Sequence, residues 1–286
     1  MKKYKLIGAG SDLGVNINGS SLGPKTIFKH IKYSNKVLIE QDPTYQKQLD
    51  SSIKNKNEDE LIKFLNQLSV FYNDALDKDE FPILIGGDHS LAISSALSSN
   101  NKQGPLGIIW FDAHADYHTH LSTTSGNMHG FPLATINGFD TKWVNKQNNT
   151  YIKEENTVIF GARSIDDGEY NNLKKTKVTL ITQNEINSLG IESALNKAFN
   201  IAHINTSGVH ISFDLDFLDP SIAKGVSTPV INGCNNNDYI TVIKYIVNQM
   251  NIIKSFDIVE YNPLFDNNNK TLSIVIDLLD KIFNIR

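Results

Sequence analysis

The sequence predicts an α/β protein in which a mainly parallel sheet is covered by helices. Two observations lead to this prediction. Short and almost continuously apolar segments recur along the 286 residues, and helical patterns with one apolar face lie between many of them. A strand that is buried on both faces is apolar throughout, whereas a half-exposed strand alternates apolar and polar residues. Such strands alternating with helices are typical of a parallel sheet, and the pattern leaves open whether the sheet closes into a barrel.

Eight segments have the apolar character of buried strands. In chain order they cover residues 4–7, 37–39, 81–85, 106–111, 158–160, 178–181, 209–213 and 252–259. Pro24 suits the first turn of a helix that buries Ile27 and Ile31. Apolar residues spaced three or four apart predict further helices within residues 61–72, 240–247 and 272–283. Because no repeat and no linker interrupts this order, we expect a single domain spanning residues 1–286.

Composition and charge exclude several classes of partner. The formal charge is −4, from 27 basic and 31 acidic residues, so no basic field attracts nucleic acid or an anionic membrane. The single cysteine, Cys234, cannot form an internal disulfide, and the sequence has neither a signal-peptide pattern nor an apolar segment long enough to cross a bilayer. We therefore expect a soluble, cytoplasmic protein.

Acidic and imidazole side chains follow three of the predicted strands. His89 lies after residues 81–85 in Gly86–Gly87–Asp88–His89–Ser90, where glycines permit a sharp turn and Asp88 or Ser90 can cap a helix. Alone, His89 is more often an ordinary buried or capping histidine than a ligand. The stronger signal is the run Asp112–Ala113–His114–Ala115–Asp116, because alternate residues of an extended chain point to one side.

A third cluster repeats this pattern, since Asp214 and Asp216 follow residues 209–213. Buried carboxylates are costly unless cations or hydrogen-bond donors compensate for them. The sequence thus predicts two divalent cations bound by His89, Asp112, His114, Asp116, Asp214 and Asp216. Because the set is rich in oxygen and lacks sulfur, it favours manganese over zinc, with iron or cobalt as possible substitutes.

These motifs resemble, in the same order, those of the ureohydrolases, and among them most closely the arginases. The resemblance covers nearly the whole chain and rests on residues 8–24, 86–90, 112–116, 125–130, 161–166, 212–220 and 257–263. It implies an open three-layer α/β/α fold with an eight-stranded, mainly parallel sheet. It also implies hydrolysis of a guanidinium group, here L-arginine to L-ornithine and urea, and a homo-oligomer, commonly a trimer or hexamer.

The resemblance further implies how the two ions are divided. His89, Asp112, Asp116 and Asp214 would bind one manganese ion, and Asp112, His114, Asp214 and Asp216 would bind the other, so that Asp112 and Asp214 bridge. Asp116 is expected to accept a proton from the attacking water. Glu260 suits the planar, cationic guanidinium, and Thr228 is expected to support that carboxylate. His129 is expected to carry a proton to the leaving amine, because imidazole titrates near neutral pH.

The expected substrate pocket departs from the arginase pattern at two positions. Ser125, Asn127 and Asp166 match the positions that contact the carboxylate and amine of the amino acid. His118 replaces a typical asparagine, however, and Ser164 replaces a common aspartate. His118 can still donate a hydrogen bond, yet its bulk is expected to reshape the pocket. Agmatine, formimidoylglutamate or another guanidino compound is therefore an alternative substrate.

Two alternatives lie outside the ureohydrolases. Paired metal ions also serve phosphoesterases, but Glu260 would repel a phosphate and no arginine cluster accompanies the motifs. A metal-stabilised binding protein without turnover is the other alternative. The presence of all six expected ligands together with His129 and Glu260 argues against it.

Overall fold

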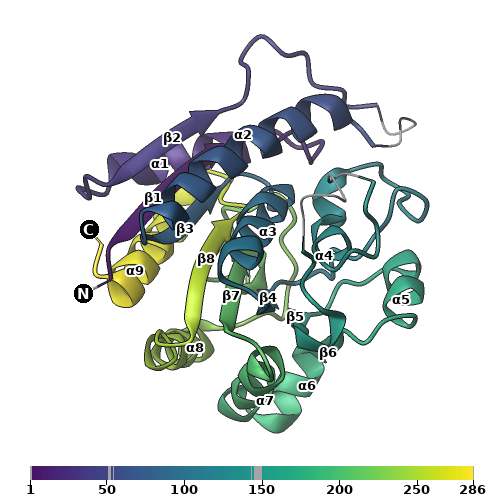
Figure 1. The fold of residues 1–286 in the computed structure, drawn as a ribbon, viewed down its shortest axis with the longest axis vertical. Helices are drawn as coiled ribbons and strands as arrows, with labels where there is room; N and C mark the ends of the chain where they lie inside the picture. Colours follow the sequence, from purple (N-terminus) through teal and green to yellow (C-terminus); the bar gives the residue numbers. More distant parts are fainter. Residues whose placement is uncertain (1, 51–52, 54, 143, 145–149, 286) are drawn as a thin grey trace.

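The computed structural model describes residues 2–50, 53, 55–142, 144 and 150–285. Its centre is an eight-stranded sheet in the order β2-β1-β3-β8-β7-β4-β5-β6, and every neighbouring pair is parallel (Figure 1). The strands are β1 (Tyr4–Gly10), β2 (Lys36–Glu40), β3 (Phe81–Gly86), β4 (Leu106–Phe111), β5 (Thr157–Ala162), β6 (Thr179–Thr182), β7 (Gly208–Asp214) and β8 (Ile253–Val259). Because β2 and β6 are the two edges, the sheet is open, which excludes the barrel and confirms the predicted fold.

Helices cover both faces of the sheet and complete a three-layer structure. They are α1 (Gly23–Lys29), α2 (Glu58–Asp77), α3 (Ala92–Gln103), α4 (Pro132–Ile136), α5 (Asp167–Leu173), α6 (Gln183–Leu189), α7 (Ile191–His203), α8 (Asn236–Asn248) and α9 (Lys270–Phe283). One apolar core joins the sheet to α1, α7, α8 and α9, and another joins it to α2, α3 and α4. Successive strand residues alternate between these cores, since Phe111 packs in the first and Trp110 in the second.

All eight predicted strands are present, and Pro24 occupies the first turn of α1 as expected. The prediction that every strand is buried on both faces is wrong for β2 and β6, whose residues are mostly half-buried. The physical reason is their position, because an edge strand has a neighbour on one side only. Among the described residues, none of the helices combines the length and apolar character needed to cross a membrane.

The sheet order places the expected functional residues side by side. β3, β8, β7 and β4 are consecutive in the sheet, and His89, Glu260, Asp214 and Asp112 lie at or just beyond their carboxyl ends. Ligands of open parallel sheets bind at this end of the strands. Residues that are up to 171 positions apart in the sequence thus meet at one edge, as the hydrogen bond between His89 and Glu260 shows.

Candidate metal centre and pocket

The turn after β3 determines where His89 lies. Gly87 packs so closely on the preceding segment that a Cβ atom there would lie 1.8 Å from the carbonyl oxygen of Ser11, so no larger residue fits. Asp88 then caps the 3-10 turn His89–Leu91 by accepting a hydrogen bond of 2.9 Å from the Ser90 N–H. One of the two predicted caps, Asp88, is therefore confirmed.

Two contacts fix the imidazole ring of His89. The ring stacks on Trp110 with the centroids 3.8 Å apart and the planes tilted by 8°. Its Nε2 lies 2.9 Å from the hydroxyl oxygen of Ser212 on β7. A partner on one ring nitrogen sets the tautomer and aims the other, so these contacts direct Nδ1 at the carboxylates.

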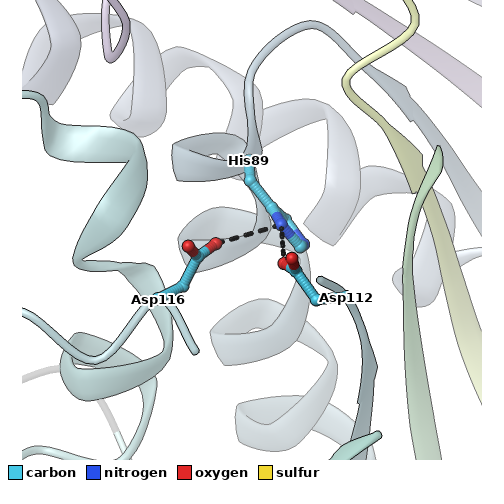
Figure 2. Close-up of side chains that lie close together, drawn as sticks. All are labelled: His89, Asp112 and Asp116. Carbon is cyan, nitrogen blue, oxygen red and sulfur yellow. Dashed lines mark ion pairs between the residues drawn. The ribbon is translucent and has the colours of Figure 1, made fainter. Parts of the chain in front are cut away.

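Nδ1 of His89 faces three carboxylates. It lies 3.0 Å from Asp112 Oδ2, 3.1 Å from Asp116 Oδ2 and 3.1 Å from Asp214 Oδ2, and Figure 2 shows the first two of these pairs. The nitrogen is buried, and none of the three oxygens is aligned to hydrogen bond with it. One imidazole nitrogen among several carboxylate oxygens, without aligned hydrogen bonds, is a donor set that fits a divalent cation.

A second group of possible ligands adjoins the first. His114 Nδ1 lies 3.0 Å from Asp216 Oδ2 and 3.5 Å from Asp112 Oδ1. His89, Asp112 and Asp116 form one group that could hold an ion, and Asp112, His114 and Asp216 form another. Asp112 belongs to both groups, which is the arrangement that a bridging carboxylate requires.

Donors from the protein hold these carboxylates in place. The indole Nε1–H of Trp110 donates to Asp112 Oδ2 at 2.9 Å, and the N–H of His114 donates to Asp112 Oδ1 at 2.6 Å. The N–H of Asp216 donates to Asp214 Oδ1 at 2.7 Å. Such supporting bonds orient ligands before a cation binds.

Burial and mutual repulsion shift the pKa values of this centre in the metal-free protein. Burial raises the pKa of Asp116 to about 7, and the charge of Asp112 adds to the shift. Burial and the charges of Asp216 and Asp112 likewise raise the pKa of Asp214 well above its usual range. Burial lowers the pKa of His89, but its three carboxylate neighbours outweigh this and raise the pKa well above its usual range. The metal-free centre therefore retains protons that cations would displace.

We expect the metal-free protein to lose stability as pH rises from 5 to 8. Above about pH 4 the unfolded chain releases protons that Asp116 and Asp214 still hold in the folded state, and above about pH 6.5 the same applies to His89. Carboxyl groups whose pKa is lowered, such as Asp112, affect stability only below that window. Melting temperatures of chelator-treated protein measure this trend, and added Mn²⁺ should raise the melting temperature more at pH 8 than at pH 5. A metal-free protein that becomes more stable from pH 5 to pH 8 would contradict this account.

A pocket opens beside the second group of carboxylates. Its wall consists of His114, Asp116, His118, Ser125, Asn127, His129, Gly130, Ser164, Asp166, Glu169, Asp214, Asp216 and Thr228. The structure thus brings five of the six predicted substrate residues together with four of the six predicted metal ligands. Glu260, the sixth predicted substrate residue, is not among these wall residues and is 1% exposed.

Glu260 and His129 form a pair at the deep end of the site. Oε1 of Glu260 accepts a hydrogen bond of 2.9 Å from the N–H of His89 and lies 3.2 Å from His129 Nδ1. Burial lowers the pKa of His129, but the hydrogen bond and charge of Glu260 outweigh burial and raise that pKa to about 9. The other oxygen, Oε2, is buried without a hydrogen-bond partner. His129 can therefore donate a proton at neutral pH, and Oε2 of Glu260 can still accept a hydrogen bond.

Thr228 does not support Glu260, and this part of the sequence prediction is wrong. Its hydroxyl donates to Asp216 Oδ2 at 3.2 Å. The reason lies in the loop that carries Thr228, because the Arg163 guanidinium donates to the carbonyls of Val230 and Asp216 at 2.8 and 2.7 Å. Arg163 thus joins Val230 to the carboxyl end of β7, while Val226 and Ser227 of the same loop contact Tyr261 and Asn262 just after β8.

The outer end of the pocket contains His118 and Asp166. His118 Nε2 lies 2.8 Å from Asp166 Oδ2, and Asp166 Oδ1 accepts the N–H groups of Gly168 and Glu169 at the start of α5. Glu169 completes a capping box there, and these hydrogen bonds account for a third group of possible ligands formed by His118, Asp166 and Glu169. Glu169 is not among the predicted site residues, although the spacing of Asp166 and Glu169 is that of a capping box.

Comparisons with known proteins place the sequence and the fold in one family. The model of the Arginase family matches residues 2–284. Arginase from Bacillus caldovelox is 32% identical over 297 residues, which cover 99% of this chain and 98% of that protein. The crystal structure of Entamoeba histolytica arginase in complex with L-ornithine is similar with a TM-score of 0.88 and 28% identity, covering 99% of both chains. Formimidoylglutamase from Bacillus subtilis shares the fold with a TM-score of 0.80 and 22% identity, covering 99% of this chain and 87% of that chain.

Proposed function

The chain belongs to the arginase family, and on that premise we propose that it hydrolyses L-arginine to L-ornithine and urea at a centre of two manganese ions. The observation that carries the proposal is the position of His89 Nδ1 among three carboxylate oxygens, beside a pocket that contains the other expected residues. The family acts on small guanidino compounds by hydrolysis. The solved relative with L-ornithine bound supports arginine as the substrate.

We propose the ligands in the division that the sequence implied. His89, Asp112, Asp116 and Asp214 would hold one ion, and Asp112, His114, Asp214 and Asp216 would hold the other. The oxygen-rich donor set favours manganese, with cobalt or iron as substitutes. When bound, such a pair of cations lowers the pKa of a water molecule enough to supply a nucleophile at neutral pH.

The protein's own residues then handle the substrate and the protons. Asp116 accepts a proton from the attacking water, because its carboxylate lies both near His89 and in the pocket wall. The unpartnered Oε2 of Glu260 accepts an N–H of the planar guanidinium, while its Oε1 stays bonded to the His89 N–H. His129 donates its proton to the leaving amine of ornithine, since the nitrogen of an amine must be protonated to leave.

The outer pocket would bind the amino-acid end of the substrate. Ser125, Asn127 and Asp166 are proposed to contact the carboxylate and amine of the amino acid, and His118 is proposed as a further hydrogen-bond donor to the carboxylate. The single catalytic domain of residues 1–286, a trimeric or hexameric assembly and a cytoplasmic location remain predictions from the sequence.

A substrate panel tests the proposal. Purified protein loaded with Mn²⁺ is expected to release urea from L-arginine with a higher kcat/KM than from agmatine, and to release no formamide from formimidoylglutamate. The three compounds differ at the end remote from the reacting group. Agmatine lacks the carboxylate that L-arginine has there, and formimidoylglutamate has a different arrangement of charged groups. If agmatine or formimidoylglutamate is hydrolysed faster than L-arginine, that compound is the substrate instead. If none of the three compounds is hydrolysed, the assignment as an enzyme is rejected.

A further inference from the structure

Lys56 is a buried lysine that contacts the wall of the pocket. It lies just before α2 and is only 2% exposed. Its ammonium Nζ donates to the carbonyl oxygen of Ser125 at 2.8 Å and to Asn127 Oδ1 at 3.2 Å. Its backbone N–H donates to the carbonyl of Gly126, between those two residues, at 3.2 Å. Lys56 thus forms hydrogen bonds with all three residues of the Ser125–Asn127 segment but does not itself line the pocket.

The charge of Lys56 has no anionic partner among the residues that the structure describes. Its hydrogen bonds go to a carbonyl and an amide, which are neutral. Lys47, in the same stretch of chain, instead forms an ion pair of 3.1 Å with Asp12. A buried ammonium group is costly unless a negative charge compensates for it. The Ser125–Asn127 side of the pocket, opposite in charge to Asp166 and Glu169 elsewhere in the wall, therefore has a positive charge behind it that an anionic ligand would neutralise.

Lys56 also decides which way the amide of Asn127 faces. An ammonium group can only donate hydrogen bonds, so it holds Oδ1 of Asn127 on its own side. The amide nitrogen Nδ2 must then point away from Lys56. It donates to Asn16 Oδ1 at 3.3 Å, and its second hydrogen is left for a ligand in the pocket. The pocket thus presents a hydrogen-bond donor with a positive charge behind it.

We propose that Lys56 is a positioning residue that makes this pocket select guanidino compounds ending in a carboxylate. It acts through Asn127 and Ser125, by fixing their orientation and by adding a buried positive charge behind them. A substrate with a neutral end, or with no group at that position, gains nothing from this arrangement. The inference deepens the proposed function and rests on it.

The first test compares two substrates that differ only in charge at this end. L-argininamide carries a neutral amide where L-arginine has its carboxylate. In Mn²⁺-loaded protein, Lys56→Met is expected to raise the KM for L-arginine by about tenfold or more, while its kcat and the KM for L-argininamide change by less than about twofold. Lys47→Met is the matched control, because it removes a lysine from the same segment, and it should leave the ratio of the two KM values unchanged. An equal rise in both KM values, or no rise for L-arginine, would overturn the proposal.

A binding measurement tests the proposal without relying on turnover. It also uses a variant that disturbs the structure less than Lys56→Met. Lys56→Gln removes the charge but retains a hydrogen-bond donor. Calorimetric titration of metal-loaded wild type should show tighter binding of L-ornithine than of putrescine, which is ornithine without its carboxylate, and Lys56→Gln should reduce this preference by about threefold or more. If the preference is unchanged, Lys56 has no such role. A wild type that releases no urea rejects the proposed function alone, because the binding preference still tests Lys56.

Discussion

Replacing Asp112 by asparagine is expected to reduce urea release to background and to lower the metal content of the purified protein. The Asp112 carboxylate lies within both groups of possible ligands, 3.0 Å from His89 Nδ1 and 3.5 Å from His114 Nδ1. Asparagine keeps the shape of the side chain but removes its charge and replaces one oxygen by a hydrogen-bond donor. Elemental analysis of metal per chain, with urea release measured on the same samples, checks both expectations.

Asp140→Asn provides the matched control for this experiment. Asp140 is also a buried aspartate, but it accepts a hydrogen bond of 2.8 Å from the N–H of His120 and belongs to neither group of ligands. It should retain the wild-type metal content even if its stability falls. If Asp112→Asn keeps both ions and full activity, the two-ion centre proposed here is wrong.

Replacing His129 by alanine is expected to slow turnover by about 10²–10⁴-fold while leaving the metal content unchanged. His129 lies in the pocket wall, and its pairing with Glu260 raises its pKa to about 9, so that it holds a proton at neutral pH. Its Nδ1 contacts Glu260 rather than any of the six expected ligands. Steady-state kinetics across pH, together with elemental analysis, measure the loss, and added imidazole should restore part of the rate.

His120→Ala is the matched control for the His129 experiment. His120 is also paired with a carboxylate, at 2.8 Å from Asp140 Oδ2, but it lies outside the wall of the candidate pocket. Its replacement should leave kcat within about twofold of the wild type. Loss of metal in His129→Ala would show that the role assigned to His129 is incorrect, and an unchanged rate would show that another group supplies the proton.

The strands could be predicted from the sequence because six of them are buried on both faces for most of their length and are mainly apolar, although β7 and β8 also bury polar residues such as His210 and Asp257. Helix α3 was indicated only by its possible caps, Asp88 and Ser90, because buried serines accompany its short apolar stripe of Ile93, Ala96 and Leu97. Helix α7 has a regular buried stripe from Ala194 to Ala202 and was missed although its pattern was available. Whether the sheet closes depends on which strands pair at its edges, and local pattern does not contain that information.

The candidate site shows the same division between local and long-range information. Asp112 and Asp116 do approach one another as predicted, but not because the chain is extended, since β4 ends at Phe111 and Asp116 has a positive φ of 50°. The partner of Thr228 was predicted wrongly, since it depends on how Arg163 holds a distant loop. Lys56 was missed for the same reason, because it contacts residues about 70 positions away in the sequence.

The position of β8 has a consequence for how the centre assembles during synthesis. All six expected ligands lie within residues 89–216, yet β3 and β7 are not neighbours in the sheet, because β8 (Ile253–Val259) is inserted between them. A nascent chain that ends after Asp216 therefore has every ligand but lacks the strand that joins the His89 side of the sheet to the Asp214 side. Proteins emerge from the ribosome starting at the N-terminus, and long-range pairing is slow. The edge of the sheet at which the expected ligands meet is therefore complete only once residues 253–259 have joined it.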